Sequence, residues 1–245
     1  MPAVGPIFLF TDFGSADIYV GQVKAVLQAE APTIPVVDLF NDAAPFDIES
    51  AAHLLAALAP RLPRGAVTLA VVDPGVGSPR APIALTADSR WFVGPDNGLV
   101  SVLAARARAS LCFPVDWLPA PQSVSFHGRD LFAPAAAHIA RGSIEMRSRA
   151  PRALDVELGG ADCARVIYVD HYGNAMTGVR ARAIDSAAAV SVAGRRISHA
   201  RVFCAAAPGE LFWYENSLGL LEIAANAASA ASLLGIDIGE AIALE

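Results

Sequence analysis

Short apolar runs alternate with helix-like segments along the first half of the chain. Runs of strand length cover residues 6–10, 34–40 and 66–73, and the first and third lead into an acidic residue. Between them, residues 17–27 and 47–59 place apolar side chains at helical spacing, and both segments open with an acid. Strands and helices that alternate in this way predict a mostly parallel sheet with helices on both of its faces.

The pattern changes after a predicted hairpin (82–87 and 91–94) and a helix over 96–107. Residues 141–154 are polar and contain proline, which is typical of a linker. The later apolar segments are short, spaced by turns and rich in β-branched or aromatic residues: 164–170, 188–197, 200–206, 210–215 and 220–225. They predict a small all-β domain, a barrel or a sandwich. We therefore expect an α/β domain over residues 1–150 and a β domain over residues 151–245.

Composition narrows the class of protein. The chain has 245 residues, of which 54% are hydrophobic and 17% charged, so it can bury a substantial core as one large domain or two modest ones. Its net charge of −6, without any run of Lys or Arg, argues against a nucleic-acid partner.

The cysteines and the N-terminus bear on metals and location. Cys112, Cys163 and Cys204 lie far apart and lack the spacing of a disulfide framework or a zinc site. The N-terminal residues lack the basic and apolar regions of a signal peptide, and no apolar stretch reaches the ~20 residues of a membrane span. We expect a cytoplasmic protein with no resident metal and no membrane partner.

Acidic residues stand where the predicted strands end. Asp12 ends the first strand, Asp73 ends the third, and Asp96 follows the hairpin. In open α/β sheets, ligands bind beyond the carboxyl ends of the strands, so Asp12 and Asp73 are candidate functional residues. Asp96 stands in the sequence GPDNG, where an acid is more often a turn former or a helix cap.

Three histidines lie in or next to predicted helices. His127 falls at a break between an apolar strand and a helix that Asp130 is able to cap, and a His beside a Gly at such a junction can project into a cleft. His53 and His138 lie within helical segments and are better explained as packed helix residues.

Two Gly-containing turns in the β-rich part carry polar and aromatic side chains. The sequence VDHYGNAMTG places Asp170, Tyr172 and Asn174 around Gly173. The later sequence YENSLGLLEIAANAAS supplies Asn216, Ser217, Asn226 and Ala227. Turns of this kind hold a polar ligand in some proteins and are ordinary hairpin turns in others, so residue type alone leaves both readings open.

Seven ordered motifs are more specific together than any one of them: TDFG, DIYVGQVKA, VVDPGVGSPR, GPDNGL, FHGRDLFAPAAA, DHYGN and NSLGLLEIAANAA. With these motifs, which run from about Phe8 to the C-terminus, the chain resembles the S-adenosylmethionine hydrolase (adenosine-forming) family, also called S-adenosyl-L-methionine hydroxide adenosyltransferases. The bacterial fluorinase and chlorinase are relatives of that family. The resemblance implies an N-terminal α/β domain, a C-terminal β-barrel domain and a homotrimer. Each active site would lie between the N-domain of one subunit and the C-domain of its neighbour.

The resemblance also implies roles for individual residues. Asp73, Arg80 and His127 match the residues that position and activate water in these hydrolases. Asp12 matches the acid that binds both ribose hydroxyls, and Phe46 matches an aromatic residue that lines the nucleoside pocket. Asp170 matches the acid that holds the methionine ammonium, and Ser217 matches the contact to the methionine carboxylate. Tyr172 and Asn174 match residues beside the adenine, and Asn226 with Ala227 match the contacts to the adenine edge.

Two features favour water over halide as the nucleophile. The halogenating relatives carry Tyr and Ser where this chain has Asp73 and Gly128, and the fluorinase has a long insertion for which the short segment from Arg80 to Asp96 leaves no room. One departure from the family pattern is Gly178, which follows Thr177 where the family usually has a Thr-Asn pair, and it bears on the shape of the adenine end.

The expected reaction is hydrolysis of S-adenosyl-L-methionine at C5′ to adenosine and L-methionine, with no cofactor. The alternatives are a chlorinase-like halogenase and a nucleoside- or S-adenosylmethionine-binding protein without turnover. Neutral methionine leaves without a proton, so the barrier depends on activation of the nucleophile. Full deprotonation of water by His127 would cost roughly 12 kcal/mol. Two routes stay open: His127 removes the proton as attack proceeds, or Arg80 stabilises a hydroxide while Asp73 orients both.

Overall fold

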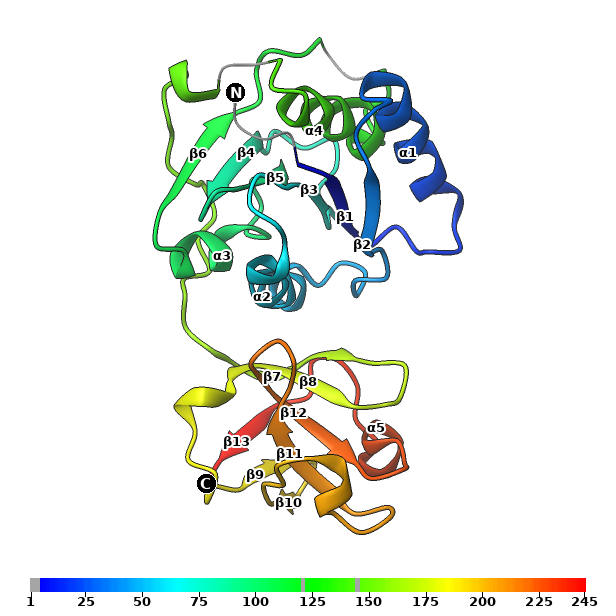
Figure 1. The fold of residues 1–245 in the computed structure, drawn as a ribbon, viewed down its shortest axis with the longest axis vertical. Helices are drawn as coiled ribbons and strands as arrows, with labels where there is room; N and C mark the ends of the chain where they lie inside the picture. Colours follow the sequence, from blue (N-terminus) through cyan, green and yellow to red (C-terminus); the bar gives the residue numbers. More distant parts are fainter. Residues whose placement is uncertain (1–4, 120–121, 144–145) are drawn as a thin grey trace. The chain divides into compact units, whose positions relative to one another are not determined.

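The computed structural model describes residues 5–119, 122–143 and 146–245. The chain forms two compact units, Met1–Gly160 and Ala161–Glu245 (Figure 1). This is the two-domain α/β organisation that the sequence predicts. Residues 151–160, expected in the second domain, lie in the first unit, and residues 144–145 of the expected linker lie outside the described residues.

The first unit is built on a mixed sheet. Its six strands, in spatial order, are β2 (Val36–Phe40), β1 (Ile7–Thr11), β3 (Val67–Val71), β5 (Arg90–Pro95), β4 (Pro82–Ala87) and β6 (Ser110–Pro114). The pairs β2–β1, β1–β3 and β3–β5 are parallel, whereas β4 is antiparallel to both β5 and β6. The expected parallel arrangement therefore holds from β2 to β5, and the β4–β5 hairpin makes the whole sheet mixed.

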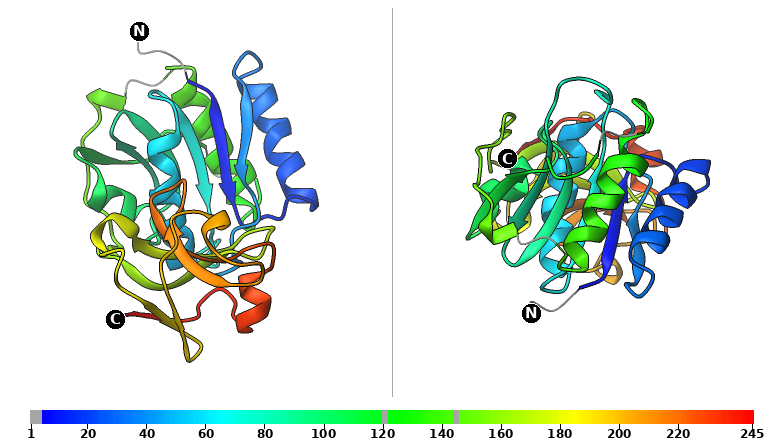
Figure 2. Two further views of the ribbon diagram at one scale, coloured as in Figure 1. Left: turned by 60° about the horizontal axis from the view of Figure 1, so that its bottom comes forward. Right: turned by 90° about the horizontal axis from the view of Figure 1, so that it is seen from above.

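Helices cover both faces of this sheet. The helices α1 (Ile18–Glu30) and α4 (Ala133–Ala140) pack together on one face, and α2 (Ile48–Leu58) and α3 (Ser101–Arg106) lie on the other (Figures 1 and 2). The side chains of Asp17 and Asp47 accept backbone hydrogen bonds at the amino ends of α1 and α2. Acids that open the two helical segments in the sequence are therefore their N-caps.

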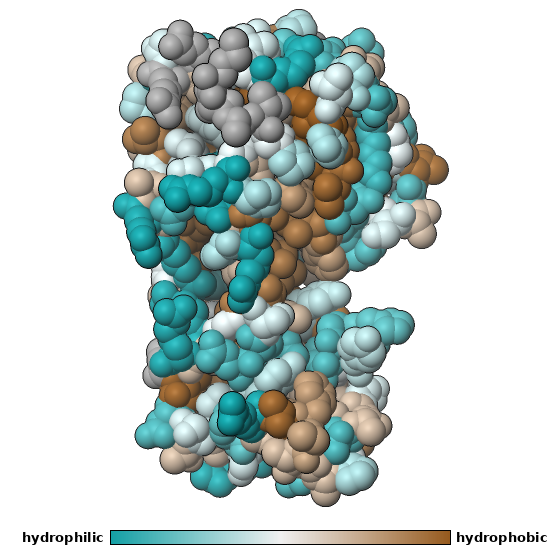
Figure 3. Space-filling view, in the orientation of Figure 1, coloured by the Kyte–Doolittle hydropathy of each residue, from teal (hydrophilic) through white to brown (hydrophobic). Residues whose placement is uncertain are grey.

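The core between the sheet and α1 and α4 unites the apolar positions of strands and helices. Leu9 and Leu69 on the strands share one cluster with Leu27 on α1 and with Phe132, and each is 1% exposed or less. Figure 3 shows apolar side chains gathered where α1 and α4 meet the sheet. Close packing of this layer fixes the ends of β1 and β3, where the candidate acids stand.

Polar contacts hold residues 151–160 to the first unit. The Arg152 backbone N–H donates to the Cys112 carbonyl at 2.9 Å, and the Arg152 guanidinium lies 3.2 Å from the Asp96 carboxylate. The Asp155 N–H donates to the same carboxylate at 2.9 Å. Asp96 thus has a structural role, as an anchor for this segment rather than as the turn former or cap that its sequence context predicts.

The second unit is antiparallel throughout its described strand pairs. A four-stranded sheet has the order β11 (Leu211–Glu215), β12 (Leu220–Ala225), β8 (Ala175–Arg180) and β7 (Cys163–Val169). A three-stranded sheet has the order β10 (Arg195–Ile197), β9 (Val190–Val192) and β13 (Ile242–Leu244), and the helix α5 (Ala230–Leu234) follows β12. The β-rich character matches the expectation, and closure into a barrel stays a prediction.

Short helical turns fill several connections: η1 (Ala59–Arg61), η2 (Gly128–Phe132), η3 (Met146–Ser148), η4 (Ala181–Ala183) and η5 (Phe203–Ala205). One of them, η5, corrects the sequence analysis. Residues 200–206 were expected as a strand, but η5 forms there and the Phe203 ring packs on Phe212 and Tyr214 at centroid distances of 5.1 and 5.4 Å.

The strand expected before His127 is also wrong. Residues 122–126 form turns, and the Asp130 carboxylate does not cap the helix. It accepts the Ser123 N–H at 2.8 Å and pairs with Arg129, so a contact across the turn has replaced the cap. Among the described residues, none of the helices has the length and hydropathy that a membrane crossing requires.

Candidate active site

The carboxyl ends of β1 and β3 lie side by side in the first unit. The two strands pair in parallel with Thr11 opposite Val71, and the Asp12 N–H donates to the Val71 carbonyl at 3.3 Å. Asp12 and Asp73 follow these ends, so both acids stand at one edge of the sheet, where ligands bind in open α/β folds.

Asp73, Arg80 and His127 form one hydrogen-bonded set, called the Asp–Arg–His set below. Nε and Nη2 of Arg80 donate to Oδ1 and Oδ2 of Asp73, with 2.7 Å between Nε and Oδ1. The same Nη2 lies 3.0 Å from Nδ1 of His127. The side chains of Arg80 and Asp73 are only 8% and 5% exposed, so the pair is not an ordinary surface ion pair of little energetic weight.

The contact with Arg80 settles the protonation of His127. A guanidinium only donates hydrogen bonds, so Nδ1 of His127 is the acceptor and the proton of the neutral ring lies on Nε2. Burial, and then the positive charge of Arg80, lower the pKa of His127 below its ordinary value, against the opposing effect of Asp73 and Asp130. At pH 7 the ring is therefore neutral, with an N–H donor at Nε2.

The loop between Asp73 and Arg80 folds back on itself through two turns. The Val76 N–H donates to the Asp73 carbonyl at 3.2 Å, and the Ser78 N–H donates to the Gly75 carbonyl at 3.0 Å. Gly77 has a φ of +84°, a conformation that favours glycine. The turn at Gly77 therefore reverses the direction of the chain, so that Arg80 lies against Asp73 at the start of the same loop.

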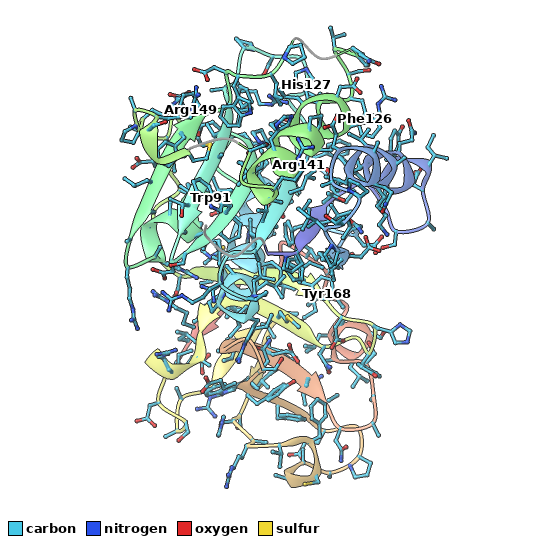
Figure 4. The ribbon with its side chains drawn as sticks, turned by 45° about the horizontal axis from the view of Figure 1, so that its top comes forward. Trp91, Phe126, His127, Arg141, Arg149 and Tyr168 are labelled. Carbon is cyan, nitrogen blue, oxygen red and sulfur yellow. The ribbon has the colours of Figure 1, made fainter. Side chains whose placement is uncertain are left out.

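The Phe132 ring packs against the set, and the sequence analysis missed this residue. The Arg80 guanidinium carbon lies 5.4 Å from the centre of the Phe132 ring, and the His127 ring lies 6.5 Å from it. Phe132 follows His127 by one turn of the π-helical segment η2. Its position one turn after a candidate histidine was the feature of the sequence that could have identified it. Figure 4 shows His127 beside Phe126 at the beginning of the helical segment that continues into α4.

Asp12 lies beside the set and next to the loop that carries Phe46. Burial raises the pKa of Asp12, the Phe46 N–H opposes this effect, and the charge of Asp73 adds to it. Phe46 is 77% exposed and has a φ of +67°, which is rare for a bulky residue. The Phe46 N–H thus points toward Asp12, and the Phe46 ring is left exposed within the chain.

In the second unit, Asp170 organises the loop that carries Tyr172 and Asn174. Its Oδ1 accepts the N–H groups of both residues at 2.9 Å, and its Oδ2 accepts the Asn174 side-chain amide at 2.9 Å. Asn174 is buried and Tyr172 is 76% exposed. A carboxylate has about four acceptor positions, so Asp170 retains capacity for one further donor.

The other candidate residues of the second unit flank β12. Ser217 lies exposed on the turn before β12, and Asn226 and Ala227 follow the strand. The Asn226 amide donates to the Ala206 carbonyl at 2.8 Å, and Ala227 has a φ of +55°. Ala227 and Phe46 therefore share a left-handed backbone without being glycines.

Gly178 lies inside β8 and not in the loop that carries Asn174. A Cβ at this position would lie 2.6 Å from the Cys163 Cβ, so the pairing with β7 leaves no space for a side chain. The departure from the family pattern is thus a feature of strand packing.

The helix histidines outside the set have partners of their own, as expected. Nδ1 of the buried His53 lies 3.3 Å from Nη2 of Arg106, and Nδ1 of His138 lies 3.0 Å from the Ser143 hydroxyl. The structure thus brings together the five candidate residues of the first unit. Those of the second unit lie on the loop between β7 and β8, the turn before β12 and the segment after β12.

Comparisons with known proteins agree along the whole chain. Residues 7–148 match the SAM hydroxide adenosyltransferase N-terminal domain, and residues 164–243 match the SAM hydroxide adenosyltransferase C-terminal domain. A protein of Thermus thermophilus named (R)-S-adenosyl-L-methionine hydrolase is 41% identical over 98% of this chain and 99% of its own. A protein of Salinispora arenicola with the same name is 40% identical over 94% of both chains.

More distant relatives and solved structures complete the comparison. A fluorinase of Actinopolyspora mzabensis is 24% identical over 92% of both chains. The crystal structure of an uncharacterized conserved protein from Thermotoga maritima superposes with a TM-score of 0.87 at 30% identity, over 98% of this chain and all of that one. The chain therefore belongs to the SAM hydroxide adenosyltransferase family.

Proposed function

We propose that this protein hydrolyses S-adenosyl-L-methionine to adenosine and L-methionine. The observation that carries the proposal is the buried Asp–Arg–His set at the sheet edge, beside Asp12. The names of its relatives support the same reaction. Because those names specify the (R) epimer at sulfur, we take the (R)-sulfonium as the preferred substrate.

The step is a substitution at C5′ of the ribose. The oxygen of water or hydroxide bonds to C5′ while the C5′–S bond breaks, and the electron pair of that bond stays on sulfur. Methionine leaves as a neutral thioether, and the proton of the water passes to solvent. An anionic nucleophile that meets a cationic substrate neutralises charge, so a site closed to water favours the attack.

Of the two routes to the nucleophile, the geometry supports stabilisation of a hydroxide by Arg80. The lone pair on Nδ1 of His127 accepts from Arg80, and Nε2 carries the ring proton, so neither nitrogen is ready to take a proton from water. In this arrangement His127 offers an N–H donor to the nucleophile and helps to orient Arg80. The guanidinium supplies the positive charge that favours hydroxide over water.

Binding roles follow the family assignments. In the first unit, Asp12 would hold the ribose hydroxyls and Phe46 would cover the nucleoside. In the second unit, Asp170 and Ser217 would bind the ammonium and carboxylate of the methionine end. Tyr172, Asn174, Asn226 and Ala227 would surround the adenine.

Halide is the less favoured nucleophile because of the packing at Gly128. A Cβ at this position would lie 2.6 Å from Cζ of Phe13, so the Ser of the halogenating relatives would require the aromatic ring to move. Asp73 occupies the place of their Tyr and binds Arg80 through both oxygens. The proposal needs no metal or organic cofactor, since Arg80 provides the charge.

The proposal extends to assembly: a cytoplasmic homotrimer in which each second unit, closed as a barrel, completes the site of a neighbouring subunit. The exposure of Phe46 and Tyr172 within one chain supports it, because an uncovered aromatic ring at a binding site gains most from being covered.

The test is incubation with each sulfonium epimer, followed by chromatography. We expect adenosine and methionine in equal amounts, faster from the (R) epimer, and no loss of activity after dialysis against EDTA. Asp73→Ala should lower kcat about 10²–10³-fold while adenosine binding is kept. Formation of 5′-chloro-5′-deoxyadenosine as the main product in chloride, or tight binding of S-adenosylmethionine without turnover, would contradict the proposal.

A further inference from the structure

Glu222 is a buried carboxylate in the second unit that the proposed reaction does not use. It lies on β12, is 2% exposed and has two hydrogen-bond donors. The Tyr214 hydroxyl donates to Oε1 at 2.5 Å, and the Asn216 side-chain amide donates to Oε2 at 2.8 Å.

Both donors are neutral groups. Within the second unit as described, Glu222 forms no salt bridge with Lys, Arg or His, and the charge that acts on it is that of Asp170, a second acid. Burial raises the pKa of Glu222, the hydrogen bonds from Asn216 and Tyr214 oppose this effect, and the charge of Asp170 adds to it. A carboxylate buried without a cation is costly, and an apolar side chain of similar size would fill this place at lower cost. Its presence therefore calls for a role beyond packing.

The contacts of Glu222 lead to the turn before β12. A carboxylate only accepts hydrogen bonds, so it holds the Nδ2 side of the Asn216 amide toward itself and directs Oδ1 into the turn. That Oδ1 accepts the N–H groups of Leu218 and Leu220 at 2.9 and 3.0 Å. The turn closed in this way, residues 216–219, presents Ser217 at the surface.

The strand that carries Glu222 also pairs with β8, which follows the loop of Asp170, the other proposed contact of the methionine end. Glu222 on β12 pairs with Met176 on β8, two residues after Asn174, whose N–H and side-chain amide both donate to Asp170. The charge of Asp170 accordingly raises the pKa of both Glu222 and Tyr214. The proposed ammonium ligand and the turn that bears the proposed carboxylate ligand thus adjoin one buried network.

We propose that Glu222 is a positioning residue for the amino-acid end of the substrate. It fixes the orientation of the Asn216 amide, which shapes the turn that presents the Ser217 hydroxyl to the carboxylate. Glu222 itself touches no substrate atom. The inference rests on the proposed function, and adenosine, which lacks the amino-acid end, provides the probe that separates the two.

The experiment compares KM, kcat and inhibition by adenosine in four proteins: wild type, Glu222→Ala, Ser217→Ala and the double variant. We expect each single variant to raise KM for the sulfonium ~10-fold, the loss of about one charge-assisted hydrogen bond, with kcat changed less than about threefold. The adenosine inhibition constant should stay at its wild-type value. KM of the double variant should be no higher than that of the single variant with the higher KM, because both changes remove the same interaction.

Glu222→Gln is the rescue. Its side-chain oxygen accepts from Asn216, and its NH₂ donates to the Tyr214 oxygen, so KM should return to within about threefold of wild type. If Glu222→Ala does not fold, Asn216→Ala takes its place in the same cycle with Ser217→Ala.

The inference is overturned if the KM losses of Glu222→Ala and Ser217→Ala multiply in the double variant, or if adenosine inhibition weakens in parallel with KM. An active wild type whose KM is unmoved by Glu222→Ala also refutes the positioning role and leaves the proposed function intact. A wild type that releases no adenosine contradicts the proposed function instead.

Discussion

Two nitrogens of Arg80 serve three acceptor atoms on two side chains. Nε and Nη2 bond both oxygens of Asp73, and Nη2 also reaches Nδ1 of His127. Only a planar fork of donors meets this requirement, and the ammonium of a Lys would not. The consequence at the scale of single residues is that the orientation of one guanidinium decides the protonation of the histidine, and through it the route to the nucleophile.

His127→Asn separates the two routes. The Asn Oδ1 takes the place of Nδ1 as the acceptor for Arg80, and the Asn NH₂ supplies a donor, but Asn is no base. If Arg80 stabilises a hydroxide, we expect kcat to fall less than about tenfold, whereas loss of a general base would lower it about 10²–10⁴-fold. Single-turnover rates of adenosine release measure the difference.

The pH profile is the control for this variant. Because burial and Arg80 lower the pKa of His127, the neutral ring persists below the ordinary His pKa, and the wild-type rate should fall only when the pH passes below that lowered value. Protonation at Nδ1 would then break the bond to Arg80. The acid limb should be missing from His127→Asn, and an unchanged limb in the variant would assign that limb to another group.

Part of this site could be predicted from residue types and order. Asp12 and Asp73 were found because each follows a buried strand, and parallel pairing puts both at one sheet edge. The meeting of Arg80 with His127 could not come from periodicity, since it depends on where two loops end, and only the ordered motifs indicated it. Asp130 was misassigned because its contact with the Ser123 N–H competes with capping.

At the scale of elements, the loop of Phe46 combines a strained backbone with an exposed ring. The loop is tied to the end of β1 by the Ala43 N–H, which donates to the Thr11 carbonyl at 3.1 Å. The φ of +67° at Phe46 places its N–H toward Asp12 and its side chain outward. Strain of this kind is retained where surrounding contacts enforce it, and here it adjoins the proposed ribose site.

Substitutions at this position should separate stability from binding. Phe46→Gly relieves the left-handed strain and removes a ring that packs little within the chain, so we expect stability equal to or above wild type. Phe46→Ala keeps a Cβ in the same conformation and should be about 1 kcal/mol less stable than Phe46→Gly. Both should weaken adenosine binding ~10-fold through loss of the ring.

Thermal unfolding and calorimetry with adenosine check this pair of variants. A Gly variant clearly less stable than wild type would mean that the ring packs within the protein. Unchanged adenosine affinity in both variants would remove Phe46 from the proposed nucleoside pocket.

Element type followed from periodicity wherever the local pattern and the tertiary contacts agree. The strands β1 to β5 and the helices capped by Asp17 and Asp47 are such cases, whereas β6 was not predicted. Residues 200–206 have strand composition, yet the Phe203 ring is drawn onto Phe212 and Tyr214 and the backbone forms a helical turn. A contact between residues distant in sequence overrides local propensity there, and a single pattern does not reveal it.

At the scale of the whole molecule, the candidate residues divide between two units. The Asp–Arg–His set and Asp12 belong to residues 1–160, and Asp170 and Ser217 belong to residues 161–245. In the proposed function, the first unit therefore carries the chemistry and the second unit recognises the methionine end. In the proposed trimer, the two halves of one site come from different subunits. Damage to the first unit of one subunit and to the second unit of another should therefore be complemented in a mixed trimer.

Two variants that are impaired in different units should complement each other when their subunits are mixed and assayed at a low concentration of substrate. Asp73→Ala damages only the first unit, and Asp170→Ala damages only the second. In a cyclic trimer whose sites each join the first unit of one subunit to the second unit of the next, a random 1:1 mixture places two intact halves together in about one quarter of the sites. Coexpression with different tags and purification through both removes the homotrimers. Every remaining trimer has one intact site in three, so we expect about one third of wild-type activity from this sample. Light scattering should give the mass of three chains for each variant. If each site were built within one subunit, every site would carry one damaged half, and the mixture would stay as impaired as its components.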